Sequence, residues 1–274
     1  MTDPMEINKR NWESRVPIHV RDATNFYDIA GFKHGRDTLH SIEASEIGDV
    51  AGLELLHLQC HFGMDTLSLA RRGARVTGLD FSSSAIGEAR KLSAELCIPA
   101  QFIEGNVYEA AKLAPGPFDF VYTSWGTICW LPDLRPWAEQ IALVLKPGGR
   151  FYFADFHPIA SMYDEVAGQI ERRFPWRTAP DQPLAADVPF TYTGDLTRLA
   201  SPETREWIHP VSEIVGSLLN AGLRLEFLHE HDCLVWPACP SMTKGGDGLY
   251  RLPPDVVPFP LSLSLMAKKP GPSS

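Results

Sequence analysis

The chain has 274 residues, of which 44% are hydrophobic and 10% aromatic, so it can bury a full core in one embellished domain. Its 34 acidic and 25 basic residues give a formal net charge of -9, which argues against a nucleic-acid partner because phosphate contacts need clustered basic side chains. No apolar run approaches the roughly 20 residues of a membrane span. The N-terminus has no signal-peptide profile, and the five cysteines form no C-x-x-C pair. We therefore expect a soluble, cytoplasmic protein without a membrane partner.

Residues 1–50 precede the first predicted core strand, and their apolar and aromatic side chains recur at helical spacing. Gly31 and Gly35 interrupt this spacing. We predict two or three short helices that form a lid over the mouth of a pocket, with Tyr27 facing an acceptor molecule. A simple cover for a sheet edge explains the same pattern equally well.

The stretch from Leu53 to Asp80 predicts one β-α-β unit. An apolar run leads into a tight turn at residues 59–65, a short amphipathic helix, and a second apolar run that ends on an acid. Peptide N–H groups at the start of the helix could hold a carboxylate or phosphate. Asp80, at the tip of the second strand, could accept hydrogen bonds from a ribose diol, although capping the next helix is an equal alternative.

Strand and helix patterns then alternate at regular spacing, which predicts a parallel, doubly wound sheet. The strands are expected at residues 100–104, 117–126 and 150–155, with helices at 82–96 and 133–145. Asn106 follows the third strand, where its amide could contact an adenine edge or cap a turn.

The segment after Asp155 is rich in turn residues and aromatics. Alternation at residues 190–193 and 205–209 predicts an inserted antiparallel hairpin over the carboxyl end of the sheet. A helix at 210–222 and strands at 223–231 and 261–267 should complete the sheet, and the tail after Lys268 has a disordered composition. A cluster of possible zinc ligands, His229, His231, Cys233 and Cys239, fits one strand face better than a metal site.

Several of these motifs together resemble the class I S-adenosylmethionine-dependent methyltransferases. They are the first strand and its turn, Asp80, Gly105-Asn106-Val107, Phe118-Asp119-Phe120-Val121, and Leu145-Lys146-Pro147-Gly148-Gly149. The resemblance implies an α/β fold with a Rossmann-like, doubly wound, seven-stranded sheet, mostly parallel with an antiparallel last strand. The expected units are an N-terminal helical lid (1–50), a cofactor-binding core (51–156), the inserted acceptor-pocket hairpin (157–208) and the C-terminal part of the sheet (209–270).

The same resemblance assigns the cofactor S-adenosylmethionine to the ends of the strands. It implies that the first turn holds the methionine part, that Asp80 binds the ribose, and that the adenine and the sulfonium region lie against neighbouring loops. The residues concerned are Gln59, His61, Gly63, Asp80, Phe81, Asn106, Val107, Ser124 and Trp125. Gln59 and His61 stand where the family has its first two motif glycines, so we expect their side chains to touch the ligand or its waters. Asn106 replaces the more common Asp.

Methyl transfer to a weak nucleophile needs removal of a proton. His157 and His209 are the first candidate bases, followed by Tyr27 and Glu206, although each histidine could equally satisfy backbone groups at an element boundary. No metal constellation is evident. Aromatic residues near the expected mouth favour a small, indole-like or phenolic acceptor, as in secondary metabolism, bound by a monomer or homodimer.

Two other functions fit the same fold. A catalytically silent S-adenosylmethionine-binding protein would have an acceptor pocket that side chains close. An NAD-dependent oxidoreductase would need the G-x-G-x-x-G turn, which is absent, and the Tyr108 and Lys112 pair falls after the wrong strand for a short-chain dehydrogenase.

Overall fold

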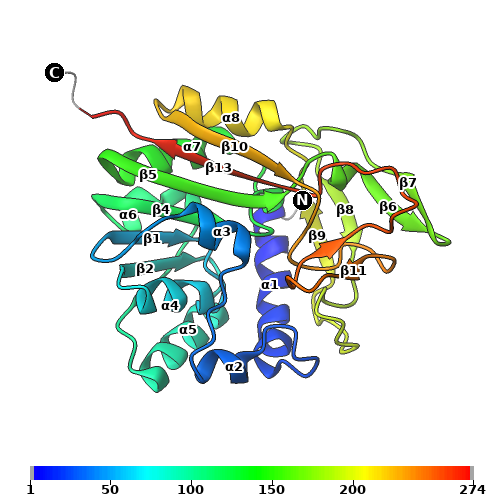
Figure 1. The fold of residues 1–274 in the computed structure, drawn as a ribbon, viewed down its shortest axis with the longest axis horizontal. Coiled ribbons are helices and arrows are strands. Elements are labelled where there is room, and N and C mark those ends of the chain that lie inside the picture. Colours follow the sequence, from blue (N-terminus) through cyan, green and yellow to red (C-terminus); the bar gives the residue numbers. More distant parts are fainter. Residues whose placement is uncertain (1–2, 272–274) are drawn as a thin grey trace.

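The computed structural model describes residues 3–271 and contains a seven-stranded sheet with the strand order β10-β13-β5-β4-β1-β2-β3 (Figure 1). Strand β13 is antiparallel to both neighbours, β5 and β10, whereas β1 to β5 are mutually parallel. The predicted doubly wound sheet with an antiparallel last strand is therefore confirmed. The strand bounds are β1 (Glu54–Leu58), β2 (Arg75–Asp80), β3 (Gln101–Glu104), β4 (Phe118–Ser124), β5 (Leu145–Phe156), β10 (Arg224–His231) and β13 (Ser262–Lys268).

Both faces of the sheet are buried because adjacent residues of each central strand pack into opposite cores. Leu56 and Val121 face the core that α7 and α8 cover, whereas Leu55 and Phe120 face the opposite core. Such strands read as continuous apolar runs, as observed here. The helices that cover the sheet are α3 (Ser41–Glu46), α4 (Met64–Arg71), α5 (Ser83–Leu96), α6 (Ala110–Leu113), α7 (Leu134–Val144) and α8 (Val211–Asn220).

The N-terminal segment forms one long helix, α1 (Pro4–Arg21), and the short helices α2 (Ile29–Lys33) and α3. The side chain of Asp3 caps the start of α1, and Asp22 ends the helix in the left-handed conformation. Figure 1 shows α1 in dark blue across the carboxyl ends of the central strands. The expected helical cover is thus present, with a first helix longer than predicted.

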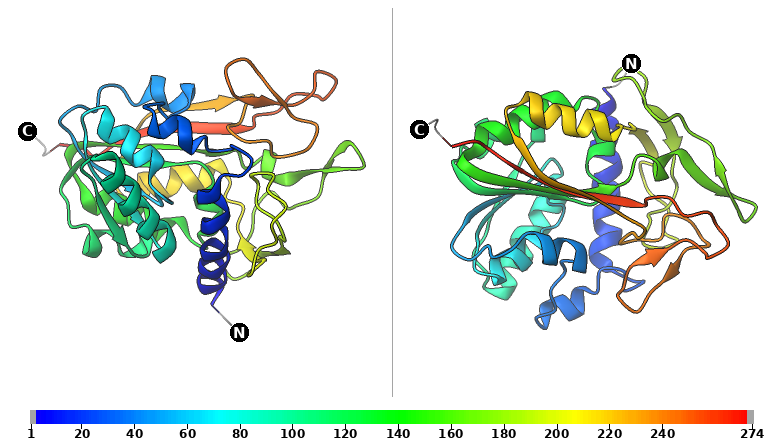
Figure 2. Two further views of the ribbon diagram at one scale, coloured as in Figure 1. Left: turned by 90° about the horizontal axis from the view of Figure 1, so that it is seen from below. Right: turned by 45° about the horizontal axis from the view of Figure 1, so that its top comes forward.

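The segment after β5 carries the antiparallel pairs β6 (Tyr163–Val166) with β7 (Gln169–Arg172) and β8 (Leu184–Asp187) with β9 (Glu203–Glu206). A further short pair, β11 (Thr243–Lys244) with β12 (Tyr250–Arg251), lies between β10 and β13. Both views of Figure 2 place α1 between the core sheet and the strands β8 and β9. An inserted hairpin after strand five is therefore confirmed.

The strands of that hairpin differ from the prediction. Residues 190–193 lie in the connection between β8 and β9, where the Thr191 and Thr193 hydroxyls bond each other at 2.5 Å and Gly194 has a φ of 78°. The alternation of Phe, Thr, Tyr and Thr thus belongs to a turn that side-chain hydrogen bonds stabilise. The predicted partner strand at 205–209 overlaps β9 only at Arg205 and Glu206.

The C-terminal tail begins later than predicted. Lys269 donates its backbone N–H to Gly149 at 2.9 Å, and its ammonium group donates to the carbonyls of Ala142 and Leu145. Residues 272–274 of the expected disordered tail lie outside the described residues. None of the helices in residues 3–271 combines the length and the apolar character needed to cross a bilayer.

Candidate cofactor and acceptor site

The first turn of the β-α-β unit has three residues with positive φ. Gln59, His61 and Gly63 have φ angles of 57°, 51° and 82°, a region that residues with a side chain rarely adopt. At Gly63 a Cβ atom would lie only 2.7 Å from the Phe102 ring, so glycine is required there. The turn therefore has the backbone conformation of a glycine motif, although Gln59 and His61 carry side chains. Backbone strain at such residues is typical of functional sites.

Asp80 ties this turn to the end of β2. Its carboxylate accepts the N–H of His61 at 2.8 Å and the N–H of Ser82 at 2.9 Å, and the residue is only 7% exposed. Burial raises the pKa of Asp80 to about 6, against the lowering effect of these backbone hydrogen bonds. Each carboxylate oxygen can accept further hydrogen bonds, which a ribose diol would donate.

Two buried polar atoms beside the turn have no hydrogen-bond partner within residues 3–271. They are Oε1 of Gln59 and Nε2 of His19, a residue of α1 whose Nδ1 lies 2.9 Å from Nε2 of His61. Buried polar atoms are nearly always paired, so these two atoms indicate a place for a polar ligand or water. The Oε1 atom of Gln59 can only accept, so it fits a donor group such as the ammonium at the methionine end of S-adenosylmethionine.

The loop after β4 is fixed by Asp155 at the end of β5. Its carboxylate accepts the N–H groups of Gly126 at 2.6 Å, Thr127 at 2.9 Å and Ile128 at 3.2 Å, and also the Thr127 hydroxyl. In turn, Nε2 of Gln59 donates to the Thr127 carbonyl at 2.9 Å. Asp155 therefore positions the loop that holds the first turn from the other side.

The other expected cofactor residues have the following environments. Asn106 accepts the Tyr108 N–H at 3.0 Å and so caps a 3-10 turn, Val107 is buried in the core, and Phe81 is half-buried next to Asp80. Ser124 is buried at the end of β4. Trp125 has a φ of 54° and donates its indole N–H to Glu43 at 2.9 Å.

A chain of four hydrogen-bonding side chains extends from the first turn to the inserted segment. His61 contacts His19, the Tyr27 hydroxyl lies 3.2 Å from Nδ1 of His19, and the hydroxyls of Tyr27 and Tyr192 lie 2.6 Å apart. Burial lowers the pKa of His61 to about 3 and that of His19 well below its ordinary value, so both rings are neutral near pH 7. This chain could carry a proton between the turn and Tyr192, which is 39% exposed.

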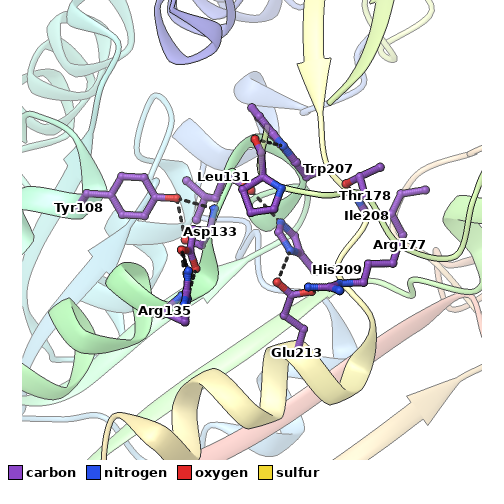
Figure 3. Close-up of polar contacts among 11 residues, drawn as sticks. Tyr108, Leu131, Asp133, Arg135, Arg177, Thr178, Trp207, Ile208, His209 and Glu213 are labelled. Carbon is purple, nitrogen blue, oxygen red and sulfur yellow. Dashed lines mark hydrogen bonds and ion pairs between the residues drawn. The ribbon is translucent and has the colours of Figure 1, made fainter. Parts of the chain in front are cut away.

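The two histidines predicted as bases have local partners. His209 donates from Nε2 to the Leu131 carbonyl at 2.7 Å, and its Nδ1 lies 3.6 Å from Glu213, which also contacts Arg177 (Figure 3). His157 contacts Glu230 at 2.9 Å and accepts the Ile159 N–H at 3.1 Å. Both histidines therefore link neighbouring elements, and neither has a hydrogen bond to the first turn.

Of the remaining candidates, Glu206 lies on β9 beside α1. Burial raises the pKa of its carboxyl, and the neighbouring charge of Arg15 partly offsets this effect. In the described part of the chain, no group of three or more His, Cys, Asp or Glu side chains is placed to hold a metal ion.

The chain is similar to known proteins both in the sequence of its β-α-β region and in its fold. Residues 55–149 match the family described as "Methyltransferase domain". This part of the chain is therefore similar to a class I S-adenosylmethionine-dependent methyltransferase domain. The computed structure superposes on a putative S-adenosylmethionine-dependent methyltransferase from Listeria monocytogenes with a TM-score of 0.58, at 16% identity over 88% of this chain and 99% of the other. That likeness confirms the methyltransferase fold.

Most of the curated relatives match only about half of this chain. A ubiquinone biosynthesis O-methyltransferase from Cronobacter sakazakii is 31% identical over 48% of this chain and 56% of its own length. The enzyme of the same description from Xanthomonas euvesicatoria is 28% identical over 74% of this chain and 77% of its own. The chain thus spans about half the length of the first of these relatives.

Three residues around the site were not singled out from the sequence as functional: Arg15, His19 and Asp155. The detectable signal was the spacing of Asn8, Asn11, Arg15 and His19, four polar residues at intervals of three and four. All four are buried on one face of α1. A polar stripe on the buried face of a helix indicates a polar interior site rather than an ordinary core.

Proposed function

We propose that this chain is an S-adenosylmethionine-dependent methyltransferase that acts on a small aromatic molecule. The observation that carries the proposal is the first turn, in which Gln59, His61 and Gly63 keep left-handed conformations while Asp80 accepts the His61 N–H. Such strain persists only where the surrounding structure enforces it, and it commonly marks ligand sites.

In this proposal the residues around the turn hold the cofactor. Gln59, His61 and Gly63 would contact its methionine end, and Asp80 its ribose hydroxyls. Phe81, Asn106 and Val107 would line the adenine site, with Ser124 and Trp125 near the sulfonium. When held by these residues, S-adenosylmethionine would supply an electrophilic methyl group to the acceptor.

The chain's own contribution is to align the acceptor and to take up its proton. The linked side chains of Tyr27, His19 and His61 offer a neutral imidazole beside the first turn, and this favours Tyr27 over the other predicted bases, His157, His209 and Glu206. A neutral histidine can accept a proton directly, or through the Tyr27 hydroxyl. Because burial disfavours the charged imidazolium, the proton would pass on towards Tyr192 and solvent.

Aromatic rings around this relay support an aromatic acceptor. Trp12 lies edge-on to Trp130, with centroids 5.5 Å apart, and Tyr192 packs on Phe26 at 5.5 Å. Aromatic side chains that line a site favour a flat, aromatic ligand, which can contact their edges and free faces. The similarity to O-methyltransferases further favours a hydroxyl oxygen as the methyl acceptor.

The experiment is a methyl-transfer screen with radiolabelled S-adenosylmethionine and a panel of phenols, indoles and aromatic amines. The account expects label transfer to at least one hydroxylated ring, and loss of transfer in an Asp80→Ala variant. Cofactor binding without transfer to any member of the panel would contradict the proposed acceptor class.

A second candidate is a silent cofactor-binding protein, which the packing of α1 favours. The Trp12 ring lies edge-on to His61 with centroids 5.2 Å apart, so α1 side chains cover the first turn. In that case α1 would respond to the bound cofactor and no methyl group would move. Single-turnover assays with a large protein excess distinguish the two functions, because even a slow enzyme would produce S-adenosylhomocysteine with a suitable acceptor.

A further inference from the structure

Arg15 is a buried cation without a carboxylate partner. The residue is 4% exposed, and within residues 3–271 no Asp or Glu oxygen lies within 4.0 Å of its guanidinium. Its only hydrogen bond there runs from Nε to Oδ1 of Asn11 at 2.6 Å. Four further N–H donors of the guanidinium fork thus have no acceptor, although a buried charge is normally paired.

Aromatic faces surround the Arg15 guanidinium. Its Cζ lies 5.2 Å from the Trp12 ring centroid, 5.8 Å from Trp130 and 6.0 Å from Tyr192. Such contacts stabilise a cation but accept no strong hydrogen bond, so they leave the N–H groups available. Glu206 on β9 also acts on the charge of Arg15, but its carboxylate lies beyond ion-pair distance.

His19 adds a second unpaired polar atom beside Arg15. The two residues are four apart on α1 and so share one face of the helix. The His19 ring packs against Trp12 and Tyr192, the same rings that flank Arg15, and its buried Nε2 has no partner in the described chain. When His61 donates to Nδ1 of His19, the proton of the neutral ring lies on Nε2, which then becomes a free donor.

We propose that Arg15, assisted by His19, binds a carboxylate on the methyl acceptor, which makes the acceptor an aromatic acid. This inference rests on the proposed function and narrows its substrate class. A planar carboxylate matches the guanidinium fork, and the three rings match a flat aromatic body. The rings come from α1, from the loop after β4 and from the inserted segment, whereas the expected cofactor contacts come from the ends of β1, β2 and β3.

The test compares a charged probe with its neutral counterpart. 4-Hydroxybenzoate and 4-hydroxybenzamide are titrated calorimetrically into the full chain, with and without saturating S-adenosylhomocysteine. The wild type should bind the acid at least about tenfold more tightly than the amide, since a charge-assisted hydrogen bond contributes that much. Arg15→Met should remove the preference, and Arg15→Lys should retain part of it.

Arg10→Met is the matched control, because Arg10 is an exposed residue on the same helix. It should keep the full preference for the acid. Thermal unfolding of each variant checks that the fold is intact, and Arg15→Lys keeps the test decisive if Arg15→Met unfolds. The inference would be overturned if the wild-type protein bound the acid and the amide equally, or if Arg15→Met still preferred the acid.

A further ligand, 5′-methylthioadenosine, tests whether Arg15 binds a carboxylate of the acceptor or the carboxylate of the cofactor. 5′-Methylthioadenosine lacks the amino-acid end that S-adenosylhomocysteine carries. The proposal expects Arg15→Met to bind both adenosyl ligands within about threefold of the wild type, a change too small for a lost charge-assisted bond. If the variant lost affinity for S-adenosylhomocysteine alone, Arg15 would bind the cofactor's own carboxylate and the acceptor inference would fail. If the protein bound no adenosyl ligand, the proposed function would be refuted. The titrations with 4-hydroxybenzoate and 4-hydroxybenzamide alone would still test whether Arg15 binds a carboxylate.

Discussion

The proposed cofactor site, around the first turn, and the proposed acceptor site, around Arg15, differ in the groups that form them. Around the first turn, the carboxylates of Asp80 and Asp155 accept short hydrogen bonds from backbone N–H groups. The proposed acceptor site includes Arg15 and His19 from α1 and Tyr192 from the inserted segment. Within residues 3–271, the two Nη atoms of Arg15 and Nε2 of His19 have no hydrogen-bond partner. If the two proposals hold, backbone groups of the fold define the cofactor site, whereas individual side chains select the acceptor.

The largest expected effect is a loss of affinity at the proposed cofactor site. Asp80→Ala removes the acceptor of the His61 and Ser82 N–H groups and any ribose contact, so affinity for S-adenosylhomocysteine should fall more than about 100-fold by calorimetry. His209→Ala is the control, because His209 bonds the Leu131 carbonyl, and it should leave cofactor affinity near normal. Equal losses in both variants would contradict the assigned roles.

The next largest effect is a loss of stability in a variant of Asp155, which holds the loop after β4. Asp155→Ala leaves the N–H groups of Gly126, Thr127 and Ile128 without their acceptor, so the free energy of unfolding should fall by about 3 kcal/mol. Urea denaturation measures this change. Asp181→Ala, at an exposed turn position, should alter stability by less than about 0.5 kcal/mol. A similar stability for both variants would show that Asp155 does not organise the loop.

On the acceptor side, Tyr27→Phe interrupts the chain from His19 to Tyr192. Turnover with an acceptor from the methyl-transfer screen should fall roughly 100-fold, near the lower bound for general acid–base assistance. Affinity for S-adenosylhomocysteine should remain unchanged, since Tyr27 does not contact the Asp80 carboxylate. Full turnover in this variant would exclude the relay.

The pH dependence of binding tests the state of Asp80. Since burial raises its pKa to about 6, the carboxylate is ionised above this pH and protonated below it. A ribose diol donates best to the ionised form, so affinity for the cofactor should fall roughly tenfold between pH 7 and pH 5. Asp80→Asn should bind weakly with no such dependence, and a flat wild-type profile would contradict the role of Asp80.

These expectations show what the sequence could predict. Apolar runs, caps and the acid at the end of β2 depend on local spacing, so the mostly parallel sheet and the position of Asp80 could be anticipated. Arg15 and His19 could not, because their surroundings come from segments far apart in the chain, including Tyr192 and Trp130. His209 looked catalytic from its chemistry, yet its partners are a backbone carbonyl and Glu213.

The smallest expected effect concerns the strained turn. Gln59→Gly relieves a positive φ, which contributes about 1 kcal/mol of stability, but it also removes the bond to the Thr127 carbonyl. If the Gln59 side chain contacts the cofactor, affinity should fall severalfold while the unfolding temperature changes little. Unchanged affinity in this variant would show that only the backbone of the turn binds the ligand.

The central claim is that the turn between β1 and α4 binds an adenosyl cofactor. Titration calorimetry of the purified protein with S-adenosylmethionine, S-adenosylhomocysteine and NAD at neutral pH tests it most directly. We expect micromolar binding of both adenosyl ligands and none of NAD. No adenosyl binding would mean that Gln59, His61 and the covering side chains of α1 have closed the site, and it would contradict the account.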